Sequence, residues 1–135
     1  MITKFFQKEI KPWGYELILN PPEAPTTAKI LHLNSGARFS LQYHDIKEES
    51  LTLISGKAKI IYGPDLNNLQ EEEMETKVGY LIPKRLIHRC QAICDCDIFE
   101  SSTKEVGTTY RLQDDYGRPD ETEEVAKEER KKGTE

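Results

Sequence analysis

The most informative stretch of the sequence is Gly36-Ala37-Arg38-Phe39-Ser40-Leu41-Gln42-Tyr43-His44, which continues through Glu49 to a second glycine, Gly56. A later segment, 79–88, ends in another histidine. Two imidazoles, one amide oxygen and one carboxylate form a mixed nitrogen and oxygen set, which suits zinc, iron, nickel, cobalt or manganese better than calcium. We therefore predict that the two segments are neighbouring strands of a small barrel that hold one divalent metal ion. The expected ligands are Gln42, His44, Glu49 and His88.

Alternation of side chains along a strand predicts that the first stretch has one polar face and one apolar face. The polar face would hold Arg38, Ser40, Gln42 and His44, and the apolar face Phe39, Leu41 and Tyr43. A strand on the protein surface would show the same alternation. The metal site is the favoured interpretation, because a glutamine and a histidine two residues apart project toward one point. A carboxylate five residues later can return to that point after a loop.

Short β-prone runs, separated by glycine, proline and polar residues, extend along the chain and predict an all-β sandwich or barrel. At 135 residues the chain is long enough for one domain with a modest core. The expected strands cover residues 15–19, 27–33, 38–43, 50–54, 57–62, 69–76, 80–82, 89–92, 96–102 and 109–112, with 3–10 as an edge strand. We expect 50–54 and 57–62 to form a hairpin, and a helix is the alternative for 69–76.

The last part of the chain differs in composition from the rest. Residues 119–135 contain seven acidic and four basic residues and almost no apolar ones. Because such a segment has almost no apolar face to bury, it is expected to form a solvated helix or a disordered tail. We therefore divide the chain into a folded domain, 1–118, and a charged tail, 119–135.

Charge and composition argue against several classes of protein. The net charge of −5, from 19 basic and 24 acidic residues, is unlike a nucleic-acid-binding surface, which normally shows a basic stripe. No apolar run approaches the length of a membrane-spanning helix. The first residues are interrupted by charge too early for a signal peptide. Without a signal, the three cysteines, Cys90, Cys94 and Cys96, indicate free thiols and a cytoplasmic location.

Two spaced motifs resemble those of the cupin superfamily. The spacing Gly36-x5-Gln42-x-His44-x4-Glu49-x6-Gly56 is similar to the first cupin motif, and Gly79-x3-Pro83-x-Arg85-x2-His88 is similar to the second. The resemblance implies a double-stranded β-helix, the jelly-roll barrel of that superfamily. Arg85 stands where the second motif has a glycine, so the turn there must change or be strained. Lys84 and Arg85 would then be a solvated loop or a contact for phosphate.

Within the cupins, the chain resembles the bacterial cupin-type mannose-6-phosphate isomerases over residues 10–118. Lys11-Pro12-Trp13-Gly14 is similar to their RPWG segment, and 38–44 to their R-x-SLQ-x-H. Arg111-Leu112-Gln113-Asp114-Asp115-Tyr116-Gly117-Arg118 is similar to the segment ending in DDYGR that closes the family. A glutamine at the position of Gln42 is usual in this group. The segment 45–50 departs from the family pattern, which places the identity of the substrate in doubt.

This resemblance implies a metal-dependent aldose–ketose isomerase that interconverts mannose 6-phosphate and fructose 6-phosphate. Zinc is the first choice of metal, with iron, manganese, nickel and cobalt as alternatives. The implied catalytic residues are Arg38, to stabilise negative charge, and Glu100, to move a proton. The implied substrate-binding residues are Lys29, Arg89, Arg111 and Arg118. Arginine suits phosphate because its planar guanidinium donates two parallel hydrogen bonds. The family also implies a homodimer, while the charge and the lack of a long apolar run argue against a nucleic-acid or membrane partner.

Two alternatives to an isomerase stay open. The chain could be a metal-binding cupin without isomerase activity that binds or senses a small ligand. It could also catalyse another cupin reaction, such as an epimerisation. An iron-dependent oxygenation is disfavoured, because that chemistry usually needs more open coordination positions than four protein ligands leave.

Overall fold

The chain forms two packed β-sheets, and along most of the strands inward-facing and outward-facing side chains alternate. The structure, a computed structural model, describes residues 1–134. Its strands are β1 (Gln7–Lys11), β2 (Gly14–Ile18), β3 (Thr26–Leu33), β4 (Leu41–His44), β5 (Glu49–Ser55), β6 (Ala58–Gly63), β7 (Gln70–Glu73), β8 (Gly79–Ile82), β9 (Ile87–Ala92), β10 (Cys96–Thr103) and β11 (Thr109–Gln113). One helix, α1 (Glu123–Gly133), follows them in the described part of the chain.

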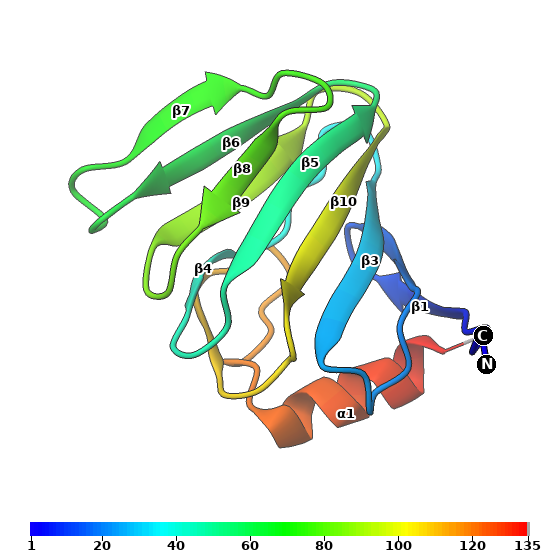
Figure 1. The fold of residues 1–135 in the computed structure, drawn as a ribbon. Coiled ribbons are helices and arrows are strands. Elements are labelled where there is room, and N and C mark those ends of the chain that lie inside the picture. The colour runs from blue at the N-terminus through cyan, green and yellow to red at the C-terminus, as the bar shows by residue number, and fades with distance from the viewer. Residues whose placement is uncertain (135) are drawn as a thin grey trace.

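The strands form a jelly-roll barrel, which confirms the all-β prediction (Figure 1). One sheet has the order β1-β2-β3-β10-β5-β8, and the other has the order β11-β4-β9-β6-β7. The N-terminal edge strand expected from the sequence is β1, which pairs with β2 at the edge of the first sheet. The sequence 69–76 contains the exposed strand β7 and no helix.

The two segments with the expected metal ligands are neighbours, as predicted. Strands β4 and β9 are antiparallel, and Gln42 is the cross-strand partner of His88. However, β4 begins only at Leu41, and Arg38 forms an isolated bridge with Gln91. The alternation assumed for 38–44 therefore breaks before Leu41. As a result, Phe39 lies in the core beside His88, so its assignment to the face opposite the ligands was wrong.

The expected hairpin between 50–54 and 57–62 is also wrong. Strand β5 belongs to the first sheet and β6 to the second, so the chain crosses between the sheets at Gly56. This glycine has a φ of +82°, and a Cβ atom there would lie 2.1 Å from the carbonyl oxygen of Asp95. The corner thus needs glycine both for its backbone conformation and for the close approach of the neighbouring corner.

The inward faces of the central strands are apolar at one end of the barrel and charged at the other. On β3, Leu31 and Leu33 lie in the core, and Lys29 precedes them on the same buried face. The corresponding inward residues, starting from the charged end, are Glu49, Leu51 and Leu53 on β5 and Glu100, Ile98 and Cys96 on β10. Because residues two apart share a face, the same strands form a hydrophobic core and a charged chamber.

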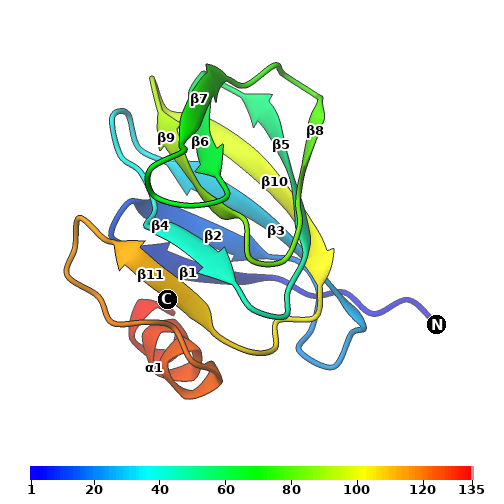
Figure 2. The same ribbon diagram turned by 90° about the vertical axis from the view of Figure 1, so that its left-hand side faces the viewer.

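Helix α1 covers the charged end of the barrel, next to β1 and β11 (Figures 1 and 2). Thr122 caps it by accepting a hydrogen bond from the Val125 amide, and its first turn is acidic and its last turn basic. The helix buries no residue completely, as its composition led us to expect. It is nevertheless not a freely solvated tail, because side chains such as Arg130 contribute to the chamber.

Candidate metal centre

Three side chains able to bind a metal ion converge at the charged end of the barrel. His44 ends β4, Glu49 begins β5 and His88 lies in β9. Their ligand atoms all lie within 4.8 Å of one another. Glu49 Oε1 is 3.2 Å from His44 Nε2 and 2.9 Å from His88 Nε2. All three residues are buried, so they form a compact group of one carboxylate and two imidazoles.

The other nitrogen of each imidazole is held by a neighbouring group. His88 Nδ1 donates to the carbonyl oxygen of Leu86 at 2.9 Å, which places the proton on Nδ1 because a carbonyl only accepts. His44 Nδ1 lies 2.8 Å from Thr109 Oγ1. Hydrogen bonds of this kind orient metal-binding histidines and select the tautomer whose other nitrogen is free to coordinate.

The charges around the group favour the ligand forms of these residues. Burial alone would raise the pKa of Glu49, but the Lys47 ammonium 3.3 Å away and the hydrogen bonds with both histidines outweigh it. The pKa of Glu49 therefore lies well below its usual value. Burial lowers the pKa of His44, which favours the neutral imidazole. Metal ions require ionised carboxylates and neutral imidazoles, so the electrostatics and the geometry agree.

This donor set fits a divalent metal ion. Because His88 Nδ1 carries a proton, a neutral His88 points the lone pair of Nε2 at a carboxylate oxygen. Two acceptors in such contact are unfavourable unless a proton or a cation lies between them. Gln42 lines the same cavity, and its Oε1 accepts a hydrogen bond from Ser40 at 2.6 Å. Coordination by Gln42 stays a prediction.

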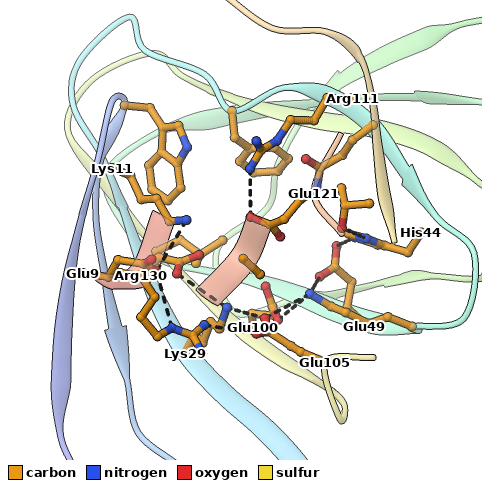
Figure 3. A pocket seen from close by; sticks show the side chains of 18 of the residues that line it. Glu9, Lys11, Lys29, His44, Glu49, Glu100, Glu105, Arg111, Glu121 and Arg130 are labelled. Atoms are coloured by element: carbon orange, nitrogen blue, oxygen red, sulfur yellow. Dashed lines mark hydrogen bonds and ion pairs between the residues drawn. The ribbon is translucent and has the colours of Figure 1, made fainter. Parts of the chain in front are cut away.

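A cavity of about 60 Å³ lies beside this group (Figure 3). Six carboxylates and six cations line it, so their formal charges cancel. The charged lining residues are Glu9, Glu16, Glu49, Glu100, Glu105, Glu121, Lys11, Lys29, Lys47, Arg111, Arg118 and Arg130. Trp13 and Phe39 add aromatic surface. Trp13 is also part of the hydrophobic core.

Two buried lysines link the carboxylates of the cavity. Lys47 Nζ lies 3.0 Å from Glu100 and 3.3 Å from Glu49. Lys29 Nζ pairs with Glu105 and lies 3.5 Å from Glu16. Burial would lower the pKa of Lys29, but Glu105 and Glu16 outweigh it and raise that pKa above its usual value. Both lysines are therefore structural counter-ions in this conformation.

Burial is the largest influence on the carboxyl group of Glu100. Burial raises the pKa of Glu100 to about 7 even though Lys47 opposes the change. Ser102 Oγ donates a hydrogen bond to Glu100 Oε2 at 3.0 Å. A carboxyl group that titrates near neutral pH can both accept and release a proton. Proton transfer by Glu100, which the family resemblance implies, stays a prediction.

The structure brings some of the predicted residues to the cavity and leaves others outside. Lys29, Glu100, Arg111 and Arg118 line the cavity. Arg38 does not line it and instead binds Asp115 with two hydrogen bonds of 2.7 and 2.9 Å. Arg89 is buried in the wall, where it donates to the carbonyl oxygens of Phe39 and Gln113. The placement of Arg38 on the ligand face was therefore wrong, because the strand does not extend back to it.

Arg85 keeps the turn that precedes His88 despite replacing glycine. Its φ is +68°, in the left-handed region that favours glycine. Its amide donates to the carbonyl oxygen of His44 at 2.9 Å, which ties the turn to the end of β4. The structure thus has the strained turn that was one of the two expected outcomes. Arg85 is exposed and does not line the cavity beside the metal-binding group.

Several residues of the site gave no signal in the sequence. Lys47 stands in a short polar segment that resembles an ordinary solvated loop, yet it is buried between two carboxylates. Arg130 is far from Glu9 and Glu16 in the sequence and meets them only because α1 closes the barrel. The alternation of β2 could have indicated that Glu16 faces inward, since Glu16 shares a face with the buried Ile18. Glu9 gave no such signal, because it shares its face of β1 with Gln7 and Lys11.

The cross-strand pair Glu9 and Glu16 predicts a distinct pH dependence of stability. Burial, followed by the charge of Glu16, raises the pKa of Glu9 to about 7. A carboxyl with a raised pKa stabilises the fold fully below its unfolded pKa near 4.5, and that contribution is lost as the pH rises through about 7. Glu16 behaves oppositely. Its pKa falls to about 2 because Lys29 and Lys11 overcome burial, so its contribution is lost below about pH 4.5.

We therefore expect Glu9→Gln to have nearly wild-type stability at pH 5 and to exceed the wild type at pH 8. The gain should be about 1–3 kcal/mol, because one pKa unit corresponds to about 1.4 kcal/mol. Urea denaturation at both values of pH measures the difference, and Glu23→Gln, at an exposed loop position, is the control. Parallel pH profiles of Glu9→Gln and the wild type would contradict the prediction.

Solved structures share this arrangement of strands. They include the capsular polysaccharide assembling protein CapF from Staphylococcus aureus, with a TM-score of 0.71, 15% identity and coverage of 83% of this chain and 33% of CapF. KdgF from Halomonas sp. matches with a TM-score of 0.63, 12% identity and coverage of 77% and 96%. Bacillus subtilis oxalate decarboxylase, which contains Mn(II) centers, matches with a TM-score of 0.66, 15% identity and coverage of 83% and 33%.

The present chain thus spans about a third of the CapF and oxalate decarboxylase chains and nearly the whole of KdgF. Neither a protein-family model nor a curated protein sequence matches it. Among residues 1–134, no helix has the length and apolar character needed to cross a membrane. The similarity to mannose-6-phosphate isomerases rests on the sequence motifs alone. What the comparisons and the coordinates show together is a cupin fold whose barrel contains a histidine–glutamate group that could bind a metal ion.

Proposed function

We propose that the chain is a metal-dependent isomerase of a phosphorylated sugar, with mannose 6-phosphate and fructose 6-phosphate as the first pair to test. The observation that carries this proposal is that His44 and Glu49 of the metal-binding group line one cavity together with Glu100. An aldose–ketose isomerisation needs a polarised carbonyl and a group that moves a proton between adjacent carbons. The sequence motifs support this reaction over other reactions of the fold.

The residues of the cavity would divide the work as follows. His44, Glu49, His88 and Gln42 would hold the ion, for which zinc is our first choice; iron, manganese, nickel and cobalt use similar ligands. The bound ion would supply Lewis-acid polarisation of a carbonyl oxygen. Glu100 would carry the transferred proton on its carboxyl oxygen, and Ser102 would hold that carboxyl in place.

Of the four substrate-binding residues that the family resemblance implies, we keep three in this proposal. Lys29, Arg111 and Arg118 line the cavity, whereas Arg89 hydrogen-bonds backbone carbonyls in the wall. Each of the three is already paired with a carboxylate in this conformation. An anionic substrate would therefore have to displace one of these pairs, which gives the site a means to select its ligand.

A metal-binding cupin without isomerase activity is the second candidate. The observation that favours it is the small cavity, whose cations are all balanced by carboxylates. Such a cavity suits a module that binds or senses a small ligand. A homodimer and a cytoplasmic location are proposals that rest on the family resemblance and the cysteine content.

Turnover of mannose 6-phosphate tests the proposal and separates the two candidates. We expect the purified chain, loaded in turn with zinc, manganese, iron(II), cobalt and nickel, to form fructose 6-phosphate with at least one metal. Glu100→Gln should lower kcat by about 10²–10⁴-fold, the range for loss of a general acid or base, and leave metal content unchanged. Glu23→Gln is the control for loss of one carboxylate.

One metal ion per chain without turnover on any of a panel of sugar phosphates would exclude the isomerase and favour the binding module. Turnover that survives Glu100→Gln at the wild-type rate would show that another group moves the proton. The first result concerns the reaction and the second concerns only the assignment of Glu100.

A further inference from the structure

Four buried side-chain atoms lack a hydrogen-bond partner in residues 1–134, and all of them belong to one cavity. They are both carboxyl oxygens of Glu9, Nε of Arg111 and Nε of Arg130, and these three residues line the cavity of the metal-binding group. A buried polar atom without a partner costs about 1–3 kcal/mol, so proteins rarely keep one without a reason. Their concentration in a single cavity marks a place where the polar atoms of a bound molecule would find partners.

Glu9 and Arg130 lie at the side of the cavity away from His44 and Glu49 (Figure 3). Glu9 on β1 and Glu16 on β2 are cross-strand partners whose side chains are buried. Two cations face this pair: Lys11 Nζ lies 3.4 Å from Glu9 Oε2, and Arg130, which reaches the pair from α1, places its Nε 3.9 Å from the same oxygen. A protonated Glu9 can share its proton with Glu16, which would satisfy only one of its two oxygens. The others still need partners.

These unpaired atoms include both hydrogen-bond donors and acceptors, which limits the kind of ligand group that could pair with them. Carboxyl oxygens accept hydrogen bonds, whereas guanidinium Nε–H groups only donate them. A hydroxyl group does both and adds no charge. A phosphate or carboxylate fits less well here, because Arg130 already binds Glu105 at 3.2 Å, Lys11 already lies 3.4 Å from Glu9, and the negative charge of Glu16 would repel an anion. The pair of carboxylates and the arginine therefore suit the hydroxyl groups of a polyol.

We propose that Glu9, Glu16 and Arg130 form a second subsite that binds the hydroxyl groups of a polyhydroxylated ligand whose other end faces the metal-binding group. This inference rests on the proposed function in one respect: it places the other end of the ligand at the metal-binding group. It does not require isomerase activity. It also makes α1 part of the binding site rather than an appendage. The helix supplies the only arginine that contacts the Glu9 carboxyl in the described part of the chain.

A neighbouring cavity provides the room that such a ligand needs. The cavity at the metal-binding group has a volume of about 60 Å³, enough for several water-sized groups. A second cavity of about 430 Å³ lies against it, beneath α1, and falls within the usual size range of small-molecule sites. Both cavities are lined by Lys29, Glu105, Ala126 and Arg130. The ion pairs from Glu105 to Lys29 and Arg130 thus form a wall that a ligand can open.

Calorimetric titration of the full-length, zinc-loaded chain tests the subsite. The probes are D-gluconate, which has five hydroxyl groups and a carboxylate, and acetate, which has only the carboxylate. We expect gluconate to bind more tightly than acetate to the wild type at pH 8. Arg130→Met and Glu9→Gln should each weaken gluconate binding by about tenfold, the effect of losing one or two hydrogen bonds, and leave acetate within twofold. Lys131→Met, at an exposed position in the same helical turn, should change neither.

The subsite is excluded if gluconate binds no better than acetate, or if both variants bind gluconate within twofold of the wild type. These results are distinguishable from failure of the proposed function. Lack of turnover on mannose 6-phosphate leaves the comparison of gluconate with acetate intact. If zinc does not bind, the same titrations of the metal-free chain still decide whether Arg130 and Glu9 contact the hydroxyl groups.

Discussion

Replacing His88 with alanine should abolish the stabilisation of the chain by added zinc. His88 is fully buried, its Nδ1 is fixed by Leu86, and its Nε2 faces the carboxylate of Glu49. Loss of one of three convergent donors should weaken metal binding by more than about 100-fold, since even outer partners of metal ligands contribute 10–100-fold. An ion at 100 times its Kd stabilises a protein by about 2.7 kcal/mol. The zinc-dependent rise in Tm should therefore disappear in His88→Ala.

The third histidine of the chain provides a matched control. His32 lies on the other side of the sheet, stacks on Tyr15 and contacts Asp97 at 2.7 Å. His32→Ala removes the same side chain and should keep the wild-type response to zinc and one metal ion per chain. Metal content is measured by mass spectrometry after purification without chelator or affinity metal. A zinc response that persists unchanged in His88→Ala would show that His44, Glu49 and His88 do not form the site.

The comparison of sequence and structure shows which parts of the site depend on local spacing. His44, Glu49 and His88 were predictable, because a strand, a loop and a neighbouring strand bring fixed positions together. Arg38 was not, because the alternation from which it was inferred holds only where the strand is regular, and β4 begins at Leu41. A short break in a strand moves every earlier side chain to the opposite face.

The charged chamber was the least predictable part, because it depends on contacts between distant segments. Arg130 belongs to a segment whose composition indicates solvation, and only the barrel's charged end explains why that helix is held. Its anchors are polar. Arg111 binds Glu129 through two hydrogen bonds of 2.9 Å, and Gly107 donates its amide to Glu123. Hydrophobic periodicity, the main signal in a sequence, carries no information about such contacts.

Burying these charged side chains lowers the stability of the fold. Lys29 occupies a core-facing position on β3, where a leucine would continue the apolar face of Leu31 and Leu33. Taking a lysine and its carboxylates out of water is unfavourable unless they pair closely. A purely structural protein gains little from such a network. Its presence next to the metal-binding group is consistent with a chamber selected for binding polar ligands.

We also expect a large effect of Lys29→Met, which should destabilise the chain by about 3–5 kcal/mol. The substitution leaves Glu16 and Glu105 without their shared cation in a buried site, and an uncompensated buried charge is costly. Denaturant titration at pH 7 gives the free energy of unfolding. Lys104→Met is the control, because Lys104 is exposed on the loop that leads to Glu105; it should change stability by less than about 0.5 kcal/mol.

A paired substitution separates lost charge compensation from lost packing. Replacing both partners of a buried ion pair with apolar residues is often neutral, whereas replacing one is not. Lys29→Met combined with Glu16→Met should therefore recover a large part of the stability lost by Lys29→Met alone. If the double variant is instead less stable by the sum of the two single effects, Lys29 stabilises the barrel by packing rather than as the counter-ion of Glu16.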